Sequence, residues 1–448
     1  MAYLFRRNIL QYLQKWKTQK ERKPLILRGA RQVGKTTAVH LFAKTFEHYI
    51  YLNMEKTEER NLCEQTATFD ELIEAIFFFK KVPKTSKNVL IFFDEIQSSP
   101  KVVSMLRFFE EERPDLHVIA AGSLLETLMD KHLTIPVGRV EYLYLYPFTF
   151  DEFLFSMDEK ELYAFLNGTK IPAFAHQALL KWFRRYTLIG GMPEVVRKFA
   201  ESQDVLQINP IYEGLLSSYL DDVEKYAQNS SLRQVIRHCI RTVFFEAGKR
   251  IKFQGFGHSN YRSREVGEAL RTLEKAMLIR LVYPTTQVKL PLMPNFKKAP
   301  KLQVLDTGLI NYFASLQEEL FRTPEIDTVY EGKIAEHIVG QELIARLKSQ
   351  IRPFVFWTRE KKQSNAEIDF LLPFQSLVIP IEVKAGAVGK LRSLHLFMDS
   401  VDHPFAIRVY SGPFRVDEVK TMAGKPFKLV NLPFYLIGNW EKILEKMM

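Results

Sequence analysis

Residues 24–46, PLILRGARQVGKTTAVHLFAKTF, decide the fold of the N-terminal part of the chain. A short apolar run at 25–27 leads into a loop of the form Gly29-x-x-x-x-Gly34-Lys35-Thr36, and a helix-forming segment follows directly. This order of strand, loop and helix is the context that a P-loop requires. Glycines let the backbone pass close to a phosphate, and the N-terminus of the following helix attracts its negative charge. The stretch therefore predicts a phosphate-binding loop rather than a turn that only caps a helix.

The P-loop predicts ATP and Mg²⁺ as ligands. Lys35 would reach the β- and γ-phosphates, and the hydroxyl of Thr36 would bind Mg²⁺. The residues expected around the nucleotide are Gly29, Ala30, Arg31, Gln32, Val33, Gly34, Lys35, Thr36 and Thr37.

A second motif, NVLIFFDE at 88–95, is an apolar run of strand length that ends in two carboxylates. Such a run is typical of a strand buried on both faces of a parallel sheet, and ligands collect where these strands end. Asp94 is expected to complete the Mg²⁺ shell, and Glu95 to orient or deprotonate the attacking water. The alternative is a strand that ends at an ordinary acidic turn.

Two further residues are candidates for the same site. Ser123 follows the strand predicted at 117–121 and could sense the γ-phosphate, cap the next helix with Glu126, or do both. Arg139 precedes the alternating segment YLYLYPFTFDEFL and could act as an arginine finger in a neighbouring subunit, which would require a homo-oligomer. The alternative is a surface arginine paired with Glu141 or Asp151.

Four ordered motifs, GARQVGKTT, LIFFDEIQ, AAGSLLE and PVGRVEYLYLYPFTFDEFL, resemble those of bacterial and archaeal AAA-type ATPases of the signal-transduction, archaeal-ATPase-like branch. The resemblance covers roughly the first 155 residues. It implies an additional-strand P-loop fold in which the carboxylate after the Mg²⁺ aspartate, here Glu95, is catalytic.

The chain of 448 residues is long enough for two to four domains, and its composition, 46% hydrophobic and 26% charged, is that of a globular protein. No apolar stretch approaches the length of a membrane span, so we expect no membrane partner. The amphipathic start is expected to pack on the ATPase core, with a membrane surface as the alternative. Two isolated cysteines, Cys63 and Cys239, are typical of a reducing, cytoplasmic compartment. The net charge of +11 gives weak support for DNA as a partner.

The middle of the chain is expected to be a helical lid at 156–204, followed by a helical and winged-helix region at 205–300. The break GGMPE at 190–194 is a turn, and in the resembling ATPases an element of this kind follows the nucleotide state; a hinge is our hypothesis. A capped helix with a β-rich exit at 263–282 outlines a winged helix. Lysines 289, 297, 298 and 301 would form a basic wing on DNA, or else a solvated loop of an interaction module.

The last third, 301–448, contains a second constellation of charged residues. Side chains alternate along a strand, so Glu367 shares a face with Asp369, and Glu382 with Lys384. Two adjacent strands would bring Asp369 and Glu382 to one Mg²⁺ or Mn²⁺ ion, with Lys384 beside the water and Glu336 approaching from a helix. Carboxylates for a divalent metal and a cation for the developing charge are what phosphodiester hydrolysis needs.

This arrangement resembles the core of the PD-(D/E)xK nucleases and the C-terminal domain of unknown function fused to the ATPases named above. The sequence thus predicts an α/β protein: a P-loop NTPase with a parallel sheet at 1–155, a helical lid, a winged-helix region and a C-terminal α/β nuclease-like domain. Its expected function is that of an ATP-driven switch. The C-terminal domain is either a metal-dependent nuclease gated by ATP or a catalytically inactive binding module, and a signalling ATPase that does not bind DNA is a third alternative.

Overall fold

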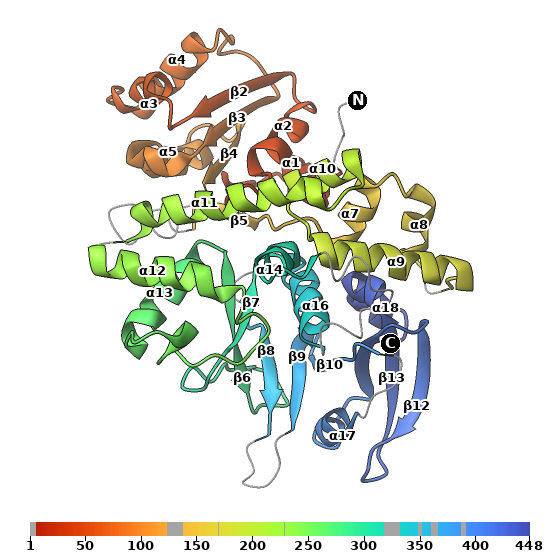
Figure 1. The fold of residues 1–448 in the computed structure, drawn as a ribbon. Coiled ribbons are helices and arrows are strands. Elements are labelled where there is room, and N and C mark those ends of the chain that lie inside the picture. The colour runs from red at the N-terminus through yellow and green to blue at the C-terminus, as the bar shows by residue number, and fades with distance from the viewer. Residues whose placement is uncertain are drawn as a thin grey trace.

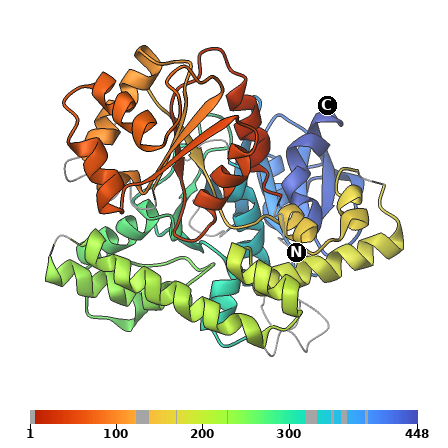
Figure 2. The ribbon, with the colours of Figure 1, turned by 90° about the horizontal axis from the view of Figure 1, so that it is seen from above.

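The computed structural model describes residues 6–122, 138–168, 170–227, 229–317, 332–347, 352–359, 366–386 and 391–448. Two separate β-sheets organise these residues, one of five strands and one of eight (Figure 1). Seen from above, the N-terminal region and the end of the chain lie on different sides of the molecule (Figure 2). The predicted α/β class, with a parallel N-terminal sheet and a separate C-terminal sheet, is confirmed.

The first sheet is parallel throughout and has the order β2-β3-β4-β1-β5. Its central strands carry only buried residues, as the apolar runs predict. Leu90 and Phe92 of β3 pack into the core that includes α1 and α2, whereas Ile91 and Phe93 face the core that includes α4 and α5. The elements are β1 (Leu25–Arg28), β2 (His48–Asn53), β3 (Val89–Asp94), β4 (His117–Gly122), β5 (Glu141–Tyr144), α1 (Ile9–Lys17), α2 (Lys35–Ala43), α3 (Thr57–Glu64), α4 (Phe69–Phe79) and α5 (Pro100–Glu111).

The amphipathic start of the chain forms α1, which packs on the first sheet's core as expected. Ile9, Leu13 and Trp16 are spaced along one face of this helix and are buried among the residues of that core. Elsewhere in the described ranges, none of the helices combines the length and the apolar character needed to cross a membrane.

A succession of helices connects the two sheets. The first group is α7 (Phe150–Ser156), α8 (Lys160–Phe165), α9 (Ala173–Ile189) and α10 (Pro193–Ser202). The second group is α11 (Asn209–Tyr226), α12 (Ser230–Val243) and α13 (Ser263–Lys275). The helix and the β-rich exit predicted at 263–282 are therefore present, as α13 followed by β6 (Ile279–Thr285).

The second sheet has the order β12-β13-β11-β10-β9-β8-β6-β7 and mixes parallel with antiparallel pairs. Because β6 pairs with both β7 and β8, strands that follow the middle helices join those of the C-terminal region in one sheet. The strands are β6 (Ile279–Thr285), β7 (Lys301–Val304), β8 (Val355–Thr358), β9 (Glu367–Phe374), β10 (Leu377–Val383), β11 (Phe405–Tyr410), β12 (Arg415–Lys420) and β13 (Pro426–Pro433). The helices around them are α14 (Thr307–Phe313), α16 (Lys333–Ala345), α17 (Arg392–Met398) and α18 (Trp440–Glu445).

The Gly190-Gly191 break lies where the two halves of the molecule meet. The amide of Gly191 donates to Asp306 Oδ2 (2.6 Å), and its carbonyl accepts from the amide of Phe148 (2.7 Å). A Cβ atom on Gly191 would lie 2.2 Å from the Phe148 carbonyl oxygen, so only glycine permits this approach. One glycine thus joins the segment after β5 to the loop before α14.

We predict that Gly191→Ala destabilises the protein by about 2 kcal/mol or more, because the added methyl group overlaps backbone atoms that cannot move independently. Gly214 in α11 is the matched control, since a Cβ there would meet nothing within 4 Å. Gly214→Ala should instead stabilise the protein by about 0.5–1 kcal/mol through helix propensity. Urea unfolding of both variants measures the difference, and equal stabilities would contradict the close approach at Gly191.

Candidate functional site

The P-loop lies between β1 and α2 and has the geometry of a phosphate site. Gly34 is the N-cap of α2, and no side chain caps the first amides of this helix. Lys35 is buried and donates to the carbonyls of Gly29 (2.9 Å) and Ala30 (3.0 Å). Burial lowers the pKa of Lys35 to about 8. Uncapped helix amides and a buried lysine at one loop suit an anionic phosphate.

The residues predicted to hold Mg²⁺ lie side by side. The Thr36 hydroxyl donates to Asp94 Oδ2 at 2.8 Å, and the Tyr51 hydroxyl approaches the same oxygen at 3.3 Å. Burial raises the pKa of Asp94, since the charged carboxylate is partly removed from water. An alcohol and a carboxylate are the hard oxygen ligands that Mg²⁺ prefers, so these two residues fit the ion.

Glu95 follows Asp94 at the end of β3 in a left-handed backbone conformation, with φ 49°. Its Oε2 accepts from the side chain of Gln97 (2.6 Å), and its charge acts on both Lys35 and Arg31. The structure thus brings Glu95 to the P-loop. Ser123, the candidate sensor, lies outside the described residues.

Arg139 is half exposed and forms ion pairs with two glutamates of α5. Its guanidinium lies 3.4 Å from Glu110 and 3.3 Å from Glu111. The expected alternative partners, Glu141 and Asp151, are not the ones it contacts in these pairs; Asp151 instead binds Arg346. The ion pairs are compatible with the alternative of a paired surface arginine, although the partners differ from Glu141 and Asp151, and the arginine finger stays a prediction.

The P-loop also contacts a helix far along the chain. Arg31 binds Asp222 of α11 through both carboxylate oxygens, at 2.6 and 2.8 Å. The Arg31 side chain is 40% exposed, whereas that of Asp222 is 3% exposed. Asp222 lies in the motif YLDDVE, which reads as an ordinary helical segment, so nothing in the sequence signals this pairing.

Residues of the second constellation lie near one another on the neighbouring strands β9 and β10 and directly after β10. Asp369 accepts from the amide of Val383 (2.8 Å), and Lys384 binds Glu382 (2.6 Å). Burial and the charge of Asp369 raise the pKa of Glu382 to about 7. Glu336 of α16 is part of the same group: burial and Asp369 raise its pKa to about 8. We call Glu336, Glu367, Asp369 and Glu382 the carboxylate cluster.

Lys301 lies within this cluster, and its assignment to a basic wing was wrong. Its ammonium group lies 2.5 Å from Glu336, 2.6 Å from Glu367 and 3.5 Å from Asp369. Burial alone would lower the pKa of Lys301, but the three carboxylates raise it. Among the described residues, no three His, Cys, Asp or Glu side chains form a ready metal site. A protein cation thus lies beside Asp369, one of the two carboxylates predicted to bind a divalent ion.

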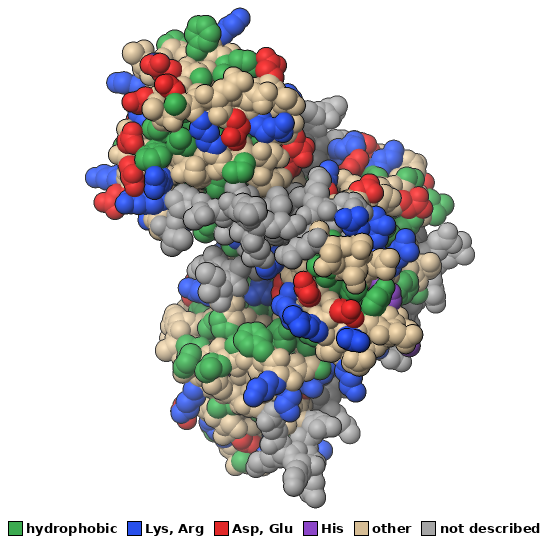
Figure 3. All heavy atoms as spheres, turned by 90° about the vertical axis from the view of Figure 1, so that its left-hand side faces the viewer, with side chains coloured by type: hydrophobic (Ala, Val, Ile, Leu, Met, Phe, Trp, Pro, Cys, Tyr) green, Lys and Arg blue, Asp and Glu red, His purple; other side chains and the backbone are tan. Residues whose placement is uncertain are grey.

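The wing is basic only in part. Lys289 contacts Asp402 at 2.7 Å, and both side chains are largely exposed, so this pair contributes little. Lys297 and Lys298 are exposed. Charged side chains of both signs are interspersed on the face of the upper lobe that is visible in Figure 3.

Comparison with protein families assigns the first domain. Residues 21–154 match the family model described as AAA domain. This match, which includes the P-loop, supports an AAA-type P-loop ATPase in the N-terminal region. Residues 180–320 and 331–423 match two families described as domains of unknown function, DUF8612 and DUF4143. A comparison with curated proteins finds no significant match. The relation of the C-terminal region to nucleases therefore remains a hypothesis.

Solved structures give distant similarities. The Walker-type ATPase PABY2304 of Pyrococcus abyssi is 15% identical with a TM-score of 0.44, over 69% of this chain and 96% of that one. The RuvB Holliday junction branch migration motor of Thermotoga maritima is 14% identical with a TM-score of 0.29, over 64% and 90%. The Aeropyrum pernix ORC1 protein, in complex with DNA, is 13% identical with a TM-score of 0.29, over 68% and 90%.

Lys301→Met should destabilise the protein by about 3–5 kcal/mol at pH 8.5, because three partly buried carboxylates lose their shared cation. The cost should fall at pH 5.5, where carboxyls of raised pKa, such as Glu336, take up protons and become neutral. Urea unfolding at the two pH values measures both effects. Lys297→Met, at an exposed position, is the matched control and should change little; an equal cost at both pH values would contradict the role of charge.

Proposed function

We propose that the protein is an ATP-hydrolysing molecular switch in which the nucleotide state of the AAA domain controls the C-terminal region. The observation that carries this proposal is the ion pair between Arg31 of the P-loop and Asp222 of α11. A γ-phosphate at the P-loop would place negative charge beside Arg31 and compete with Asp222 for it. Nucleotide binding would therefore change a contact between the AAA domain and the middle helices.

The residues at the P-loop have separate roles in ATP binding and hydrolysis. Lys35 and the amides at the start of α2 hold the phosphates, while Thr36 and Asp94 hold Mg²⁺. Bound Mg²⁺ neutralises charge on the phosphates. Glu95 orients the attacking water or accepts its proton, and the contact with Gln97 fixes its carboxylate. Arg139, if presented to a neighbouring subunit, would stabilise the transferring group in a homo-oligomer.

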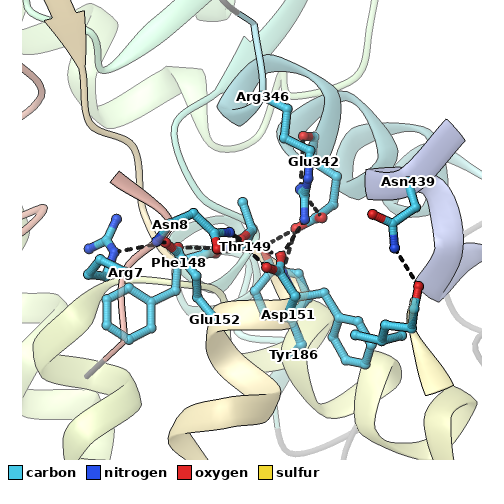
Figure 4. A network of polar contacts seen from close by, with 12 residues as sticks. Arg7, Asn8, Phe148, Thr149, Asp151, Glu152, Tyr186, Glu342, Arg346 and Asn439 are labelled. Carbon is cyan, nitrogen blue, oxygen red and sulfur yellow. Dashed lines mark hydrogen bonds and ion pairs between the residues drawn. The ribbon is translucent and has the colours of Figure 1, made fainter. Parts of the chain in front are cut away.

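A polar junction supports communication with the C-terminal region (Figure 4). Arg346, directly after α16, binds Asp151 in the first turn of α7 and also binds Glu342 at 2.5 Å. Glu342 in turn accepts from the amide of Phe150 (2.8 Å) and lies 2.7 Å from the Tyr186 hydroxyl. The start of α7, α9 and the end of α16 thus each contribute groups to one buried network of hydrogen bonds and ion pairs. A movement of Phe150 and Asp151 at the end of the AAA domain would therefore displace Glu342 and Arg346. Glu342 lies on α16, which also carries Glu336 of the carboxylate cluster.

The catalytic assignment is tested by two substitutions. Lys35→Ala should abolish ATP binding, because the loop loses the cation that contacts the phosphates. Glu95→Gln should keep ATP binding and lose hydrolysis by at least about 100-fold. Calorimetry and a phosphate-release assay separate the two effects. Hydrolysis at the wild-type rate by Glu95→Gln would show that Glu95 is not the catalytic carboxylate.

The coupling is tested at Asp222. Asp222→Asn should keep hydrolysis but remove the effect of ATP on the rest of the chain, measured as nucleotide-dependent protection from limited proteolysis. Asp221→Asn is the matched control, because the neighbouring Asp221 is exposed and has no such contact with Arg31 among the described pairs. The proposal fails if Asp222→Asn responds to ATP as the wild type does.

Two outputs are open for the C-terminal region. The juxtaposition of Asp369, Glu382 and Lys384 favours metal-dependent cleavage of DNA or RNA, whereas Lys301 inside the cluster favours a binding module without catalysis. Wild type and Asp369→Ala are to be incubated with plasmid or RNA in Mg²⁺ or Mn²⁺. Cleavage by the wild type alone supports a nuclease. Equal, background-level cleavage by both proteins on every substrate rejects it and leaves the binding module.

A further inference from the structure

A cavity of about 440 Å³ lies where three parts of the chain meet. It is lined by the end of β5, by α13 and β6, and by α16 with the segment that leads into β8. None of the residues assigned above to ATP or to the carboxylate cluster lines it. Its volume is within the range of about 300–1,000 Å³ that small-molecule sites occupy.

The charges around this cavity are mainly positive. Arg271 and Lys275 are exposed residues of α13 and, four positions apart, share one face of the helix. Arg280 and Arg352 add two more cations to the lining, and Glu274 is the one acidic residue among the residues that line it. One oxygen of Glu274 accepts from the amide of Leu281 at 2.8 Å. The cavity therefore favours an anion.

Aromatic rings line the cavity from two directions. Tyr144 and Tyr146 come from the AAA domain, whereas Phe296 and Phe354 come from the region of the second sheet. Phe296 is 72% exposed, so most of its ring surface is open to a ligand. The guanidinium of Arg280 lies 5.4 Å from the centre of the Phe354 ring. Rings and guanidinium planes of this kind stack on flat bases.

We propose that this cavity binds a nucleotide unit, a planar base with a phosphate, separately from ATP at the P-loop. The base stacks on the aromatic walls, and the phosphate pairs with the cations of α13. A free mononucleotide and the end of a nucleic-acid strand share this chemistry. Simple apolar ligands do not need the cations, and inorganic anions do not need the rings.

A ligand in this cavity would lie against a wall that is joined to the P-loop. The Tyr146 carbonyl accepts from Arg7 at 2.6 Å, and the same guanidinium donates to the carbonyl of Val33 in the P-loop at 3.0 Å. The Tyr146 side chain is in turn hydrogen-bonded to Arg280. Any coupling between the two sites must be reciprocal, so a ligand that alters ATP affinity has its own affinity altered equally.

The test uses the full chain carrying Lys35→Ala, so that the P-loop does not contribute binding. Two probes distinguish the sources of the ligand: AMP by calorimetry, and a 5′-phosphorylated hexathymidylate with a 3′ fluorophore by anisotropy. The cavity variants are Phe296→Ala and the double variant Arg271→Gln/Lys275→Gln. The matched control is Lys252→Gln/Lys446→Gln, which removes the same charge from exposed lysines outside the cavity.

We expect at least one probe to bind, and each cavity variant to weaken that binding by about tenfold or more, while the control variant keeps it. Binding of AMP identifies a free mononucleotide as the ligand class, and binding of the oligonucleotide alone identifies a strand. The proposal is overturned if neither probe binds, or if the cavity variants bind as the control does. Because Lys35 is already replaced, these outcomes are independent of whether the AAA domain hydrolyses ATP. Unchanged urea unfolding curves confirm that the variants are folded.

Discussion

The buried guanidinium of Arg7 is the interaction on which the arrangement of the N-terminal half depends. It donates to the P-loop carbonyl of Val33 and to the carbonyl of Tyr146, pairs with Glu152 at 3.2 Å, and lies over the ring of Phe148. Arg7 and Glu152 are each 5% exposed, so removal of either would leave a buried charge without its counterion. The start of the chain thus fixes the position of the loop relative to the segment after β5.

That segment is also where the AAA domain contacts the middle helices and α16. Within a few residues it contacts Arg7, the Gly190-Gly191 break and the Arg346–Glu342 pair (Figure 4). Buried polar contacts are directional, whereas apolar contacts tolerate sliding. Partners held in this way keep one geometry until the charge at one of them changes. A phosphate bound at the P-loop would be such a change, since this loop is contacted by Arg7 and contains Arg31.

The N-terminal half could be predicted from the sequence because its signals are local. The strand, the glycine loop, Lys35 and Thr36 are contiguous, and NVLIFFDE contains both a buried strand and its carboxylates, so Thr36 and Asp94 meet as expected. The long-range pairs could not be predicted. Asp222 lies 191 positions from Arg31, and no sequence motif around either residue predicts contact with the other. Arg139 has acidic residues on several elements within reach, and only the packing of α5 decides which of them it meets.

In the C-terminal half, the contacts of Lys301 could likewise not be predicted from the sequence. They also explain why a nuclease and a binding module are hard to distinguish. In the sequence Lys301 belongs to a run of lysines among prolines, which reads as a solvated loop. In the structure the pairing of β7 with β6 places it so that its side chain passes the ring of Phe356 and ends among carboxylates.

A lysine supplies one positive charge to a cluster of four carboxylates, and burial raises the pKa of two of them, Glu336 and Glu382. Lys384 partly compensates Glu382, whose other oxygen has no hydrogen-bond partner. The cluster therefore holds an internal cation, and protonation of Glu336 and Glu382 offsets part of its remaining negative charge. Lys301 is the first residue of β7, and Glu336 lies on α16, so a movement of either element relative to β9 would change the balance of charge in the cluster.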